Sequence, residues 1–193
     1  GIINKIGAFD AGMAALSKKT KGKEFLLVSL VFLLTTLGGT TFGLAEETIA
    51  FYPILMPIFL LSGFDVLTCI AAIYMGSSIG TMFSTVNPFA TVIASNAAGI
   101  SFTEGLTFRI ITLILASVIT LAYMYWYTQK VKKDKTKSYV YADEEEIHKR
   151  FLGEYDASSE KEFTWRRKLC LLIFALAFPV LIWGVSLGGW WFE

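Results

Sequence analysis

Two adjacent acidic residues, Glu46 and Glu47, lie in one of the most apolar regions of this chain. The surrounding stretch, LGGTTFGLAEETIAFYP, also contains a cluster of glycines and threonines. An ionised carboxylate in the middle of a bilayer costs a few kcal/mol, so a pair persists there only if it faces a wet cavity, takes up protons or meets a cation. The pair therefore indicates a proton or cation site within a membrane. The alternative is that both acids lie in an outer aqueous loop.

A second polar stretch, GSSIGTMFSTVNP, covers residues 76–88 and also lies between apolar segments. Pro88 lacks a backbone donor and disfavours the helical conformation at Asn87. We therefore predict an unwound stretch at residues 81–88 and a second half-helix that starts at Pro88. Each polar stretch also has two glycines four residues apart, which is the spacing of closely packed helices; the pairs are Gly39 with Gly43 and Gly76 with Gly80.

Interrupted helices can form a binding site, because non-helical backbone is tolerated in a membrane only where protein or water covers it. Free carbonyl groups of broken helices coordinate cations, while the N-termini of half-helices face anions. The two interruptions, at 38–48 and 81–88, also supply neutral oxygens that suit a hard cation or a polar substrate; these belong to Thr40, Thr41, Ser84, Thr85 and Asn87. Sodium near Ser84, Thr85 and Asn87, or a proton, is the candidate coupling ion.

The composition indicates an all-α integral membrane protein. The mean hydropathy is +0.57, and 54% of the 193 residues are hydrophobic while 17% are charged. A soluble domain has about a quarter charged residues and no apolar run near 20 residues long.

The basic residues are concentrated in two segments. Five of the 17 lie in residues 1–24 and eleven in residues 130–168, which leaves Arg109 alone. By the positive-inside rule, both segments are expected to be cytoplasmic. Nine of the 16 acidic residues share the second segment, so it is a mixed, solvated loop and does not predict a nucleic-acid partner.

The expected order of segments follows from these patterns. It is a cytoplasmic amphipathic lead-in (1–24), a hydrophobic block (25–62), a broken transmembrane helix (65–100), a transmembrane helix (106–129), a cytoplasmic loop (130–168), a final transmembrane helix (169–187) and an outer end (188–193).

The hydrophobic block at 25–62 has two interpretations. Its apolar arms, 25–37 and 48–61, would be about 20 Å long as helices, against a bilayer core of about 30 Å. Two such arms are typical of a re-entrant hairpin that enters and leaves on one side. If the first helix instead continues to Ala45, it spans about 31 Å and the block becomes two full spans. The residues alone leave both open.

Several classes of site are not indicated. The sequence has no phosphate-binding Walker loop, zinc-ligand spacing or serine-hydrolase elbow, so we expect neither an enzyme nor a cofactor or structural metal. Cys69 and Cys170 lie in separate apolar segments and are read as packing residues. His148 is expected on a solvated face of a charged helix.

The motifs GGTTFGLAEETIAFYPILMP and STVNPFATVIASNAAGIS resemble the YfcC-like branch of the anaerobic C4-dicarboxylate carrier family, within the ion-transporter superfamily. The later stretch HKRFLGEYDASSEKEFTWRRKL is also similar to the central loop of that branch. The resemblance covers essentially all of residues 1–193 and favours the hairpin interpretation of 25–62.

The resemblance implies two inverted repeats, each with a hairpin and a broken helix. This chain would be a fragment with the end of the first repeat, the central loop and the start of the second. Contacts to ion and substrate would come from the hairpin tip and the helix break: Gly39, Thr40, Thr41, Gly43, Glu46, Glu47, Thr48, Ser84, Thr85 and Asn87, with Gly76, Gly80 and Pro88 at the break.

The expected function is a secondary active transporter or exchanger in a bacterial cytoplasmic membrane, crossing it several times. The resemblance implies either a C4-dicarboxylate or a basic amino acid such as arginine or ornithine, and the acidic pair favours the latter. The expected partners are the lipid bilayer, the small-molecule substrate and the second repeat of the same polypeptide, with a homodimer as a candidate assembly. The alternative is a channel-like or scaffold protein without coupled transport.

Overall fold

The computed structural model describes residues 24–152 together with 164–166, 168–170, 172, 173, 176 and 180. The chain divides into two compact units, residues 20–156 and residues 1–19 with 157–193. In the second of these, the described residues other than Thr164 are helical. Most of the predicted lead-in (1–24), the end of the loop (130–168), much of the final span (169–187) and the outer end (188–193) lie outside the described residues.

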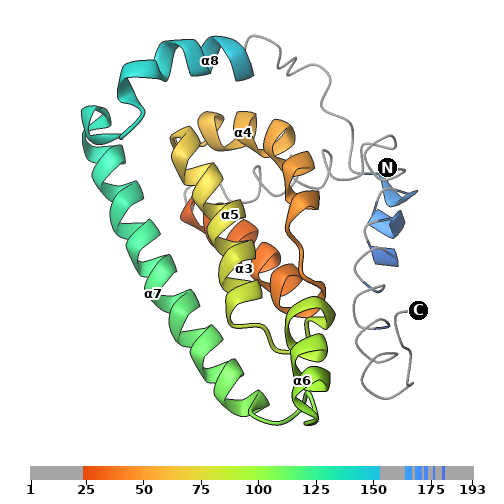
Figure 1. The fold of residues 1–193 in the computed structure, drawn as a ribbon. Coiled ribbons are helices and arrows are strands. Elements are labelled where there is room, and N and C mark those ends of the chain that lie inside the picture. The colour runs from red at the N-terminus through yellow and green to blue at the C-terminus, as the bar shows by residue number, and fades with distance from the viewer. Residues whose placement is uncertain are drawn as a thin grey trace. The chain divides into compact units, whose positions relative to one another are not determined.

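Every regular element in residues 24–152 is helical, as the sequence predicts (Figure 1). The α-helices are α3 (Phe25–Phe42), α4 (Tyr52–Leu61), α5 (Val66–Met82), α6 (Ile93–Ala98), α7 (Leu106–Lys133) and α8 (Glu144–Leu152). The shorter turns are the 3-10 helices η1 (Glu46–Phe51), η3 (Lys135–Lys137) and η4 (Tyr141–Asp143), and the π-helical turn η2 (Pro88–Val92).

Helices α3 and α5 form the centre of the described unit, because small residues let their backbones come close together. A Cβ atom added at Gly80 would overlap the carbonyl oxygen of Thr36, and one added at Gly39 would overlap that of Ser77. The Thr35 hydroxyl also donates to the Ala72 carbonyl at 3.0 Å, from one helix to the other. The side chains that are fully buried around this contact are mostly apolar, among them Leu27, Val28, Phe32, Phe59 and Ile73.

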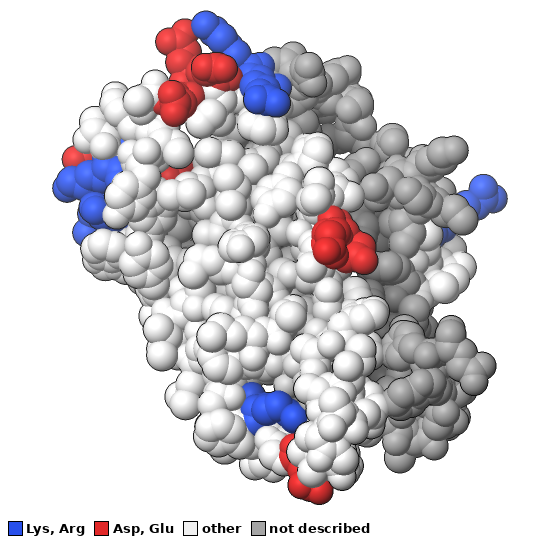
Figure 2. Space-filling model, viewed as in Figure 1, with Lys and Arg blue, Asp and Glu red and all other residues white. Residues whose placement is uncertain are grey.

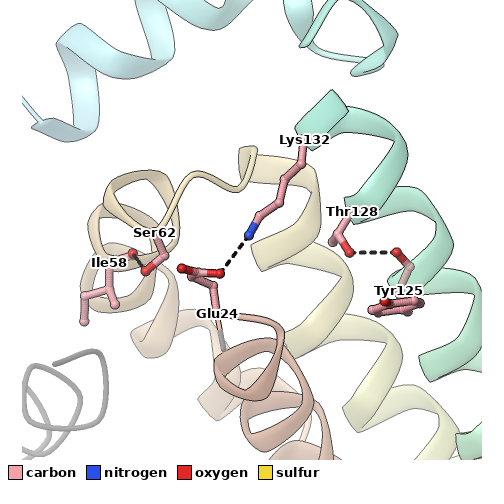
Figure 3. Close-up of polar contacts among 6 residues, drawn as sticks. All are labelled: Glu24, Ile58, Ser62, Tyr125, Thr128 and Lys132. Atoms are coloured by element: carbon pink, nitrogen blue, oxygen red, sulfur yellow. Dashed lines mark hydrogen bonds and ion pairs between the residues drawn. The ribbon is translucent and has the colours of Figure 1, made fainter. Parts of the chain in front are cut away.

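Segment 25–62 returns to the end of the unit where it begins. Glu24, just before α3, pairs with Lys132 near the end of α7 at 3.1 Å (Figure 3). The same Lys132 ammonium lies 4.7 Å from the ring centroid of Phe64, which follows α4. The residues before α3 and after α4 therefore meet one side chain of α7, which fits both a hairpin and a pair of spans.

Helix α3 is longer than the predicted 25–37 arm. It contains 18 residues and ends at Phe42, so residues 38–42 are helical and the predicted interruption at 38–48 is wrong for them. The helix is about 27 Å long. The chain then turns at residues 43–45 and continues through η1 into α4.

The break in segment 65–100 lies at residues 83–87. Helix α5 ends at Met82, and the helical turn η2 begins at Pro88, the residue at which the sequence places the second half-helix. Gly76 and Gly80 lie inside α5, so the prediction that they belong to the break is wrong; they pack against α3 instead.

Two described helices, α3 and α7, are long and apolar enough to cross a membrane by length and composition, and α5 is a shorter apolar helix. Helix α7 continues to Lys133, beyond the predicted end at residue 129. It lies along one side of the α3–α5 pair (Figure 1). Large apolar side chains of α7 such as Ile111, Leu115 and Ile119 are exposed. Uncharged side chains form most of the described surface in the view of Figure 2, as expected for a protein surrounded by lipid.

Candidate functional site

The end of α3 and the break after α5 meet through two threonines. The Thr40 and Thr85 hydroxyl oxygens lie 3.1 Å apart, and the Thr85 backbone N–H donates to the Thr40 hydroxyl at 2.9 Å. The next backbone N–H, that of Val86, donates to the Thr40 carbonyl at 3.3 Å. Thr40 and Thr85 are 45 positions apart in the sequence, so the structure brings the two predicted polar stretches together.

Asn87 joins the same two segments and caps the second half-helix. Its side-chain amide donates to the Gly39 carbonyl at 3.0 Å. Its side-chain oxygen accepts from the backbone N–H groups of Phe89 at 2.9 Å and Ala90 at 3.2 Å. The side chain is fully buried, so these bonds replace the water that an amide would otherwise need. Asn87 is therefore first of all a structural residue of this site.

Gly43 makes the turn after α3 and leaves room for Asn87. Its φ angle of +77° lies in the left-handed region, which glycine adopts without steric cost. A Cβ atom there would lie 3.0 Å from the Asn87 side-chain nitrogen and 3.2 Å from the Phe89 ring. The turn continues to Leu44, whose carbonyl accepts a hydrogen bond from the Ser77 hydroxyl of α5.

Ser84 completes the buried cluster with a residue that the sequence prediction missed. Its hydroxyl pairs with the hydroxyl of Thr91, which also donates to the Ser84 carbonyl at 3.3 Å. Ser77 was missed as well. Thr91 follows Asn87 by one helical turn, and this spacing could have indicated that Thr91 belongs to the cluster. No pattern in the sequence indicates Ser77, because hydroxyls in apolar helices usually bond to the backbone of their own helix.

The acidic pair does not join this cluster. Glu46 and Glu47 are exposed on the first turn of η1, and the Glu47 carboxylate accepts from the Ala45 backbone N–H at 3.3 Å. Thr48 is buried, but its hydroxyl donates to the Ala45 carbonyl. The Thr41 hydroxyl donates to the Leu37 carbonyl within α3.

The cluster can offer hydroxyl and carbonyl oxygens to a ligand, mainly at its edge. Thr40 and Ser84 are 3% and 5% exposed, whereas Thr85 is half-buried and can be reached from outside. In the described residues no group of three or more His, Cys, Asp or Glu side chains is placed to hold a metal ion. A ligand here would be bound by neutral oxygens, with the exposed carboxylates of η1 following the turn in the chain.

The whole chain, residues 1–193, matches the family described as C4-dicarboxylate anaerobic carrier. It is 53% identical over 192 residues to an uncharacterized protein of Haemophilus influenzae, covering 100% of this chain and 38% of that protein. It is 34% identical over 191 residues to YfcC of Escherichia coli K12, which has the provisional name basic amino acid antiporter, covering 98% and 37%. The chain thus spans just over a third of the length of these curated relatives. No solved structure matches.

Proposed function

This chain belongs to the C4-dicarboxylate anaerobic carrier family, and from that premise we propose that it is part of a secondary transporter or exchanger of a small charged metabolite. The observation that supports this most is the meeting of two interrupted helical segments, through Thr40 with Thr85 and Gly39 with Asn87. Interrupted helices in membranes occur where backbone and polar side chains line a site for ion or substrate. The membrane is the bacterial cytoplasmic one, and the remaining part of the polypeptide completes the site.

The substrate that fits these residues best is a basic amino acid. Residues 25–108 contain no Lys, Arg or His, while Glu46 and Glu47 follow directly on the turn beside the cluster. A cationic side chain or ammonium group would pair with these carboxylates. The provisional name of the Escherichia coli relative is consistent with this choice.

A C4-dicarboxylate, which the family description names, is the second candidate. Without a basic residue, a dianion would depend on the N-terminus of the second half-helix. The first two N–H groups there, of Phe89 and Ala90, already donate to the Asn87 side chain. The next two, of Thr91 and Val92, donate to the Asn87 carbonyl at 2.8 and 3.1 Å. The half-helix is thus capped by protein, which favours the cation.

Segment 25–62 acts as a re-entrant hairpin in this proposal. The support is the resemblance described above together with the length of α4, which has 10 residues, about 15 Å of α-helix against a bilayer core of about 30 Å. Sodium, held by the oxygens near Ser84, Thr85 and Asn87, or a proton, held by Glu46 or Glu47, would be the coupling ion.

The test is counterflow with the full-length protein in liposomes. Vesicles preloaded with unlabelled ornithine should take up labelled arginine against its gradient, and vesicles preloaded with succinate should not. If only vesicles preloaded with succinate show uptake, and the solute they accumulate is a labelled C4-dicarboxylate, the second candidate replaces the first. No stimulation by either, with or without a sodium or proton gradient, would favour a channel-like or scaffold protein and overturn the proposal.

A further inference from the structure

The carboxylate of Asp65 connects three parts of the chain at the end of the unit where α4 passes into α5. One oxygen caps α5, because it accepts from the Thr68 backbone N–H at 2.9 Å and from the Thr68 hydroxyl at 2.6 Å. The other oxygen accepts from the Tyr127 hydroxyl of α7 at 2.5 Å and from the Ser138 hydroxyl at 2.6 Å. Ser138 belongs to residues 134–152, which we call the connector.

Further contacts hold the connector at the same place. The Tyr139 ring stacks on the Tyr127 ring with 5.7 Å between centroids and 3° between planes. The Lys130 ammonium lies over both the Trp126 and Tyr139 rings, at 5.2 and 5.9 Å from their centroids. Cation–π contacts at exposed sites are weak, so these contacts support the hydrogen bonds to Asp65 and do not replace them.

The connector covers the Asp65 carboxylate. A cavity of about 60 Å3 lies between the connector and the turn from α4 to α5, and its lining includes Asp65, Ser138, Glu144 and His148. Within the connector, Lys135 pairs with Glu144 at 3.1 Å. His148 is half-buried in the lining of this cavity. The sequence instead predicts that it lies on a solvated helix face.

Asp65 is too far from the candidate site to be a ligand of it. It caps the first turn of α5, and the break follows the last turn of this 17-residue helix, about 26 Å away. The hydrogen bonds instead link segments 62 and 73 positions apart in the sequence. Hydrogen bonds to a charged acceptor are stronger than those to a neutral one, so a carboxylate holds these segments together better than a neutral side chain would.

We propose that Asp65 is a positioning residue, which docks the connector onto the ends of α5 and α7. The connector is then a fixed part of the helical unit and not a free linker between the parts of the transporter. This inference does not depend on the substrate or on the transport activity proposed above.

Limited proteolysis of the full-length protein in detergent tests the docking. Lys135 and Lys137 are exposed trypsin sites in the connector, and cleavage follows the population of an opened connector when opening is fast. In Asp65→Asn, the amide can still cap α5 but no longer accepts from both Tyr127 and Ser138. Cleavage at these lysines should rise about tenfold. Asp143→Asn, the same change at an exposed connector residue, should leave the rate unaltered.

The partners of Asp65 separate docking from a general loss of folding. Ser138→Ala and Tyr127→Phe should each raise cleavage by less than Asp65→Asn does, and the variant with both changes should reach it within about twofold. Adding Asp65→Asn to that double variant should then have little further effect. Fully additive effects, or unaltered cleavage in Asp65→Asn, would overturn the inference. So would a tenfold rise in the substrate KM of Asp65→Asn without any change in cleavage.

Discussion

At the scale of single residues, Asn87 shows how a predicted ligand can be a structural residue. Its amide group has one donor and one acceptor already engaged, to Gly39 on one side and to Phe89 and Ala90 on the other. A ligand would have to displace these bonds in a fully buried place, whereas Thr85 remains half-buried and reachable. The hydroxyl of Thr85 is thus the better candidate for direct contact with a bound ion or substrate.

The Asn87→Asp variant should lose stability although it has the same shape. The acid can still cap the half-helix, but an oxygen replaces the nitrogen that donates to Gly39, so two acceptors face each other in a buried place. The free energy of unfolding should fall by about 2 kcal/mol. Thermal unfolding in detergent measures this, with Asn96→Asp on the exposed face of α6 as the matched control. Equal unfolding temperatures for both variants would contradict the assigned role.

The proposal of a cationic substrate depends on the carboxylates of Glu46 and Glu47. If Glu46 or Glu47 pairs with a cationic substrate, Glu46→Gln or Glu47→Gln should raise the KM for arginine about tenfold, which corresponds to about 1.4 kcal/mol. Glu104→Gln, at an exposed residue of the turn before α7, should not alter it. Uptake assays in liposomes measure the three KM values. If the KM values of all three variants equal the KM of the unaltered protein, neither Glu46 nor Glu47 binds the substrate.

At the scale of elements, the C-terminal end of α3 was the least predictable feature, whereas its start at Phe25 agrees with the sequence prediction. Glycines and threonines at 38–41 indicate a helix end by their intrinsic propensities. In the structure, Gly39 packs on α5 and the hydroxyls of Thr36 and Thr41 donate to carbonyls one turn earlier, at 2.7 and 2.6 Å. Packing between the helices thus outweighs intrinsic propensity, and this packing is not visible in the sequence of a single segment.

The contact between α3 and α5 should not tolerate a larger residue at Gly80. In Gly80→Ala, the added methyl group would overlap the Thr36 carbonyl, and the backbone of a packed helix cannot easily move away. We expect a loss of about 1–3 kcal/mol of unfolding free energy, measured by thermal unfolding. Ser78→Ala, two residues earlier on the exposed face of α5, is the control. If the two variants are equally stable, the helices have more room than the structure gives them.

The helix break, in contrast, was predictable from local chemistry. Pro88 has no N–H to donate and restricts Asn87, which in the structure takes a non-helical backbone with ψ of 120° and caps the next turn. The neighbours of the break were less predictable. Which residue of α3 faces Thr85 depends on the register between α3 and α5, which the glycine contacts set and which requires both helices at once.

At the scale of the whole molecule, charge predicts sidedness but not the number of crossings. The lysines at the end of α7 and the Glu24–Lys132 pair lie at one end of the described unit, and the turn with Ser101 and Glu104 precedes the other end of α7. A hairpin and a pair of full spans at 25–62 both return the chain to the lysine end. Only the depth of the turn at residues 43–51 distinguishes them.

Single cysteines at that turn measure its depth. In a background without other cysteines, Ser101→Cys should react quickly with a membrane-impermeant maleimide added to whole cells. Asp143→Cys should react only after permeabilisation, because the connector is expected on the cytoplasmic side. In a hairpin the turn ends within the bilayer, so Glu46→Cys should react at least about tenfold more slowly than Ser101→Cys. If Glu46→Cys instead reacts as quickly from outside, segment 25–62 crosses the membrane twice. The acidic pair then lies in outer solvent, and a cationic substrate would meet these carboxylates only before it enters the membrane.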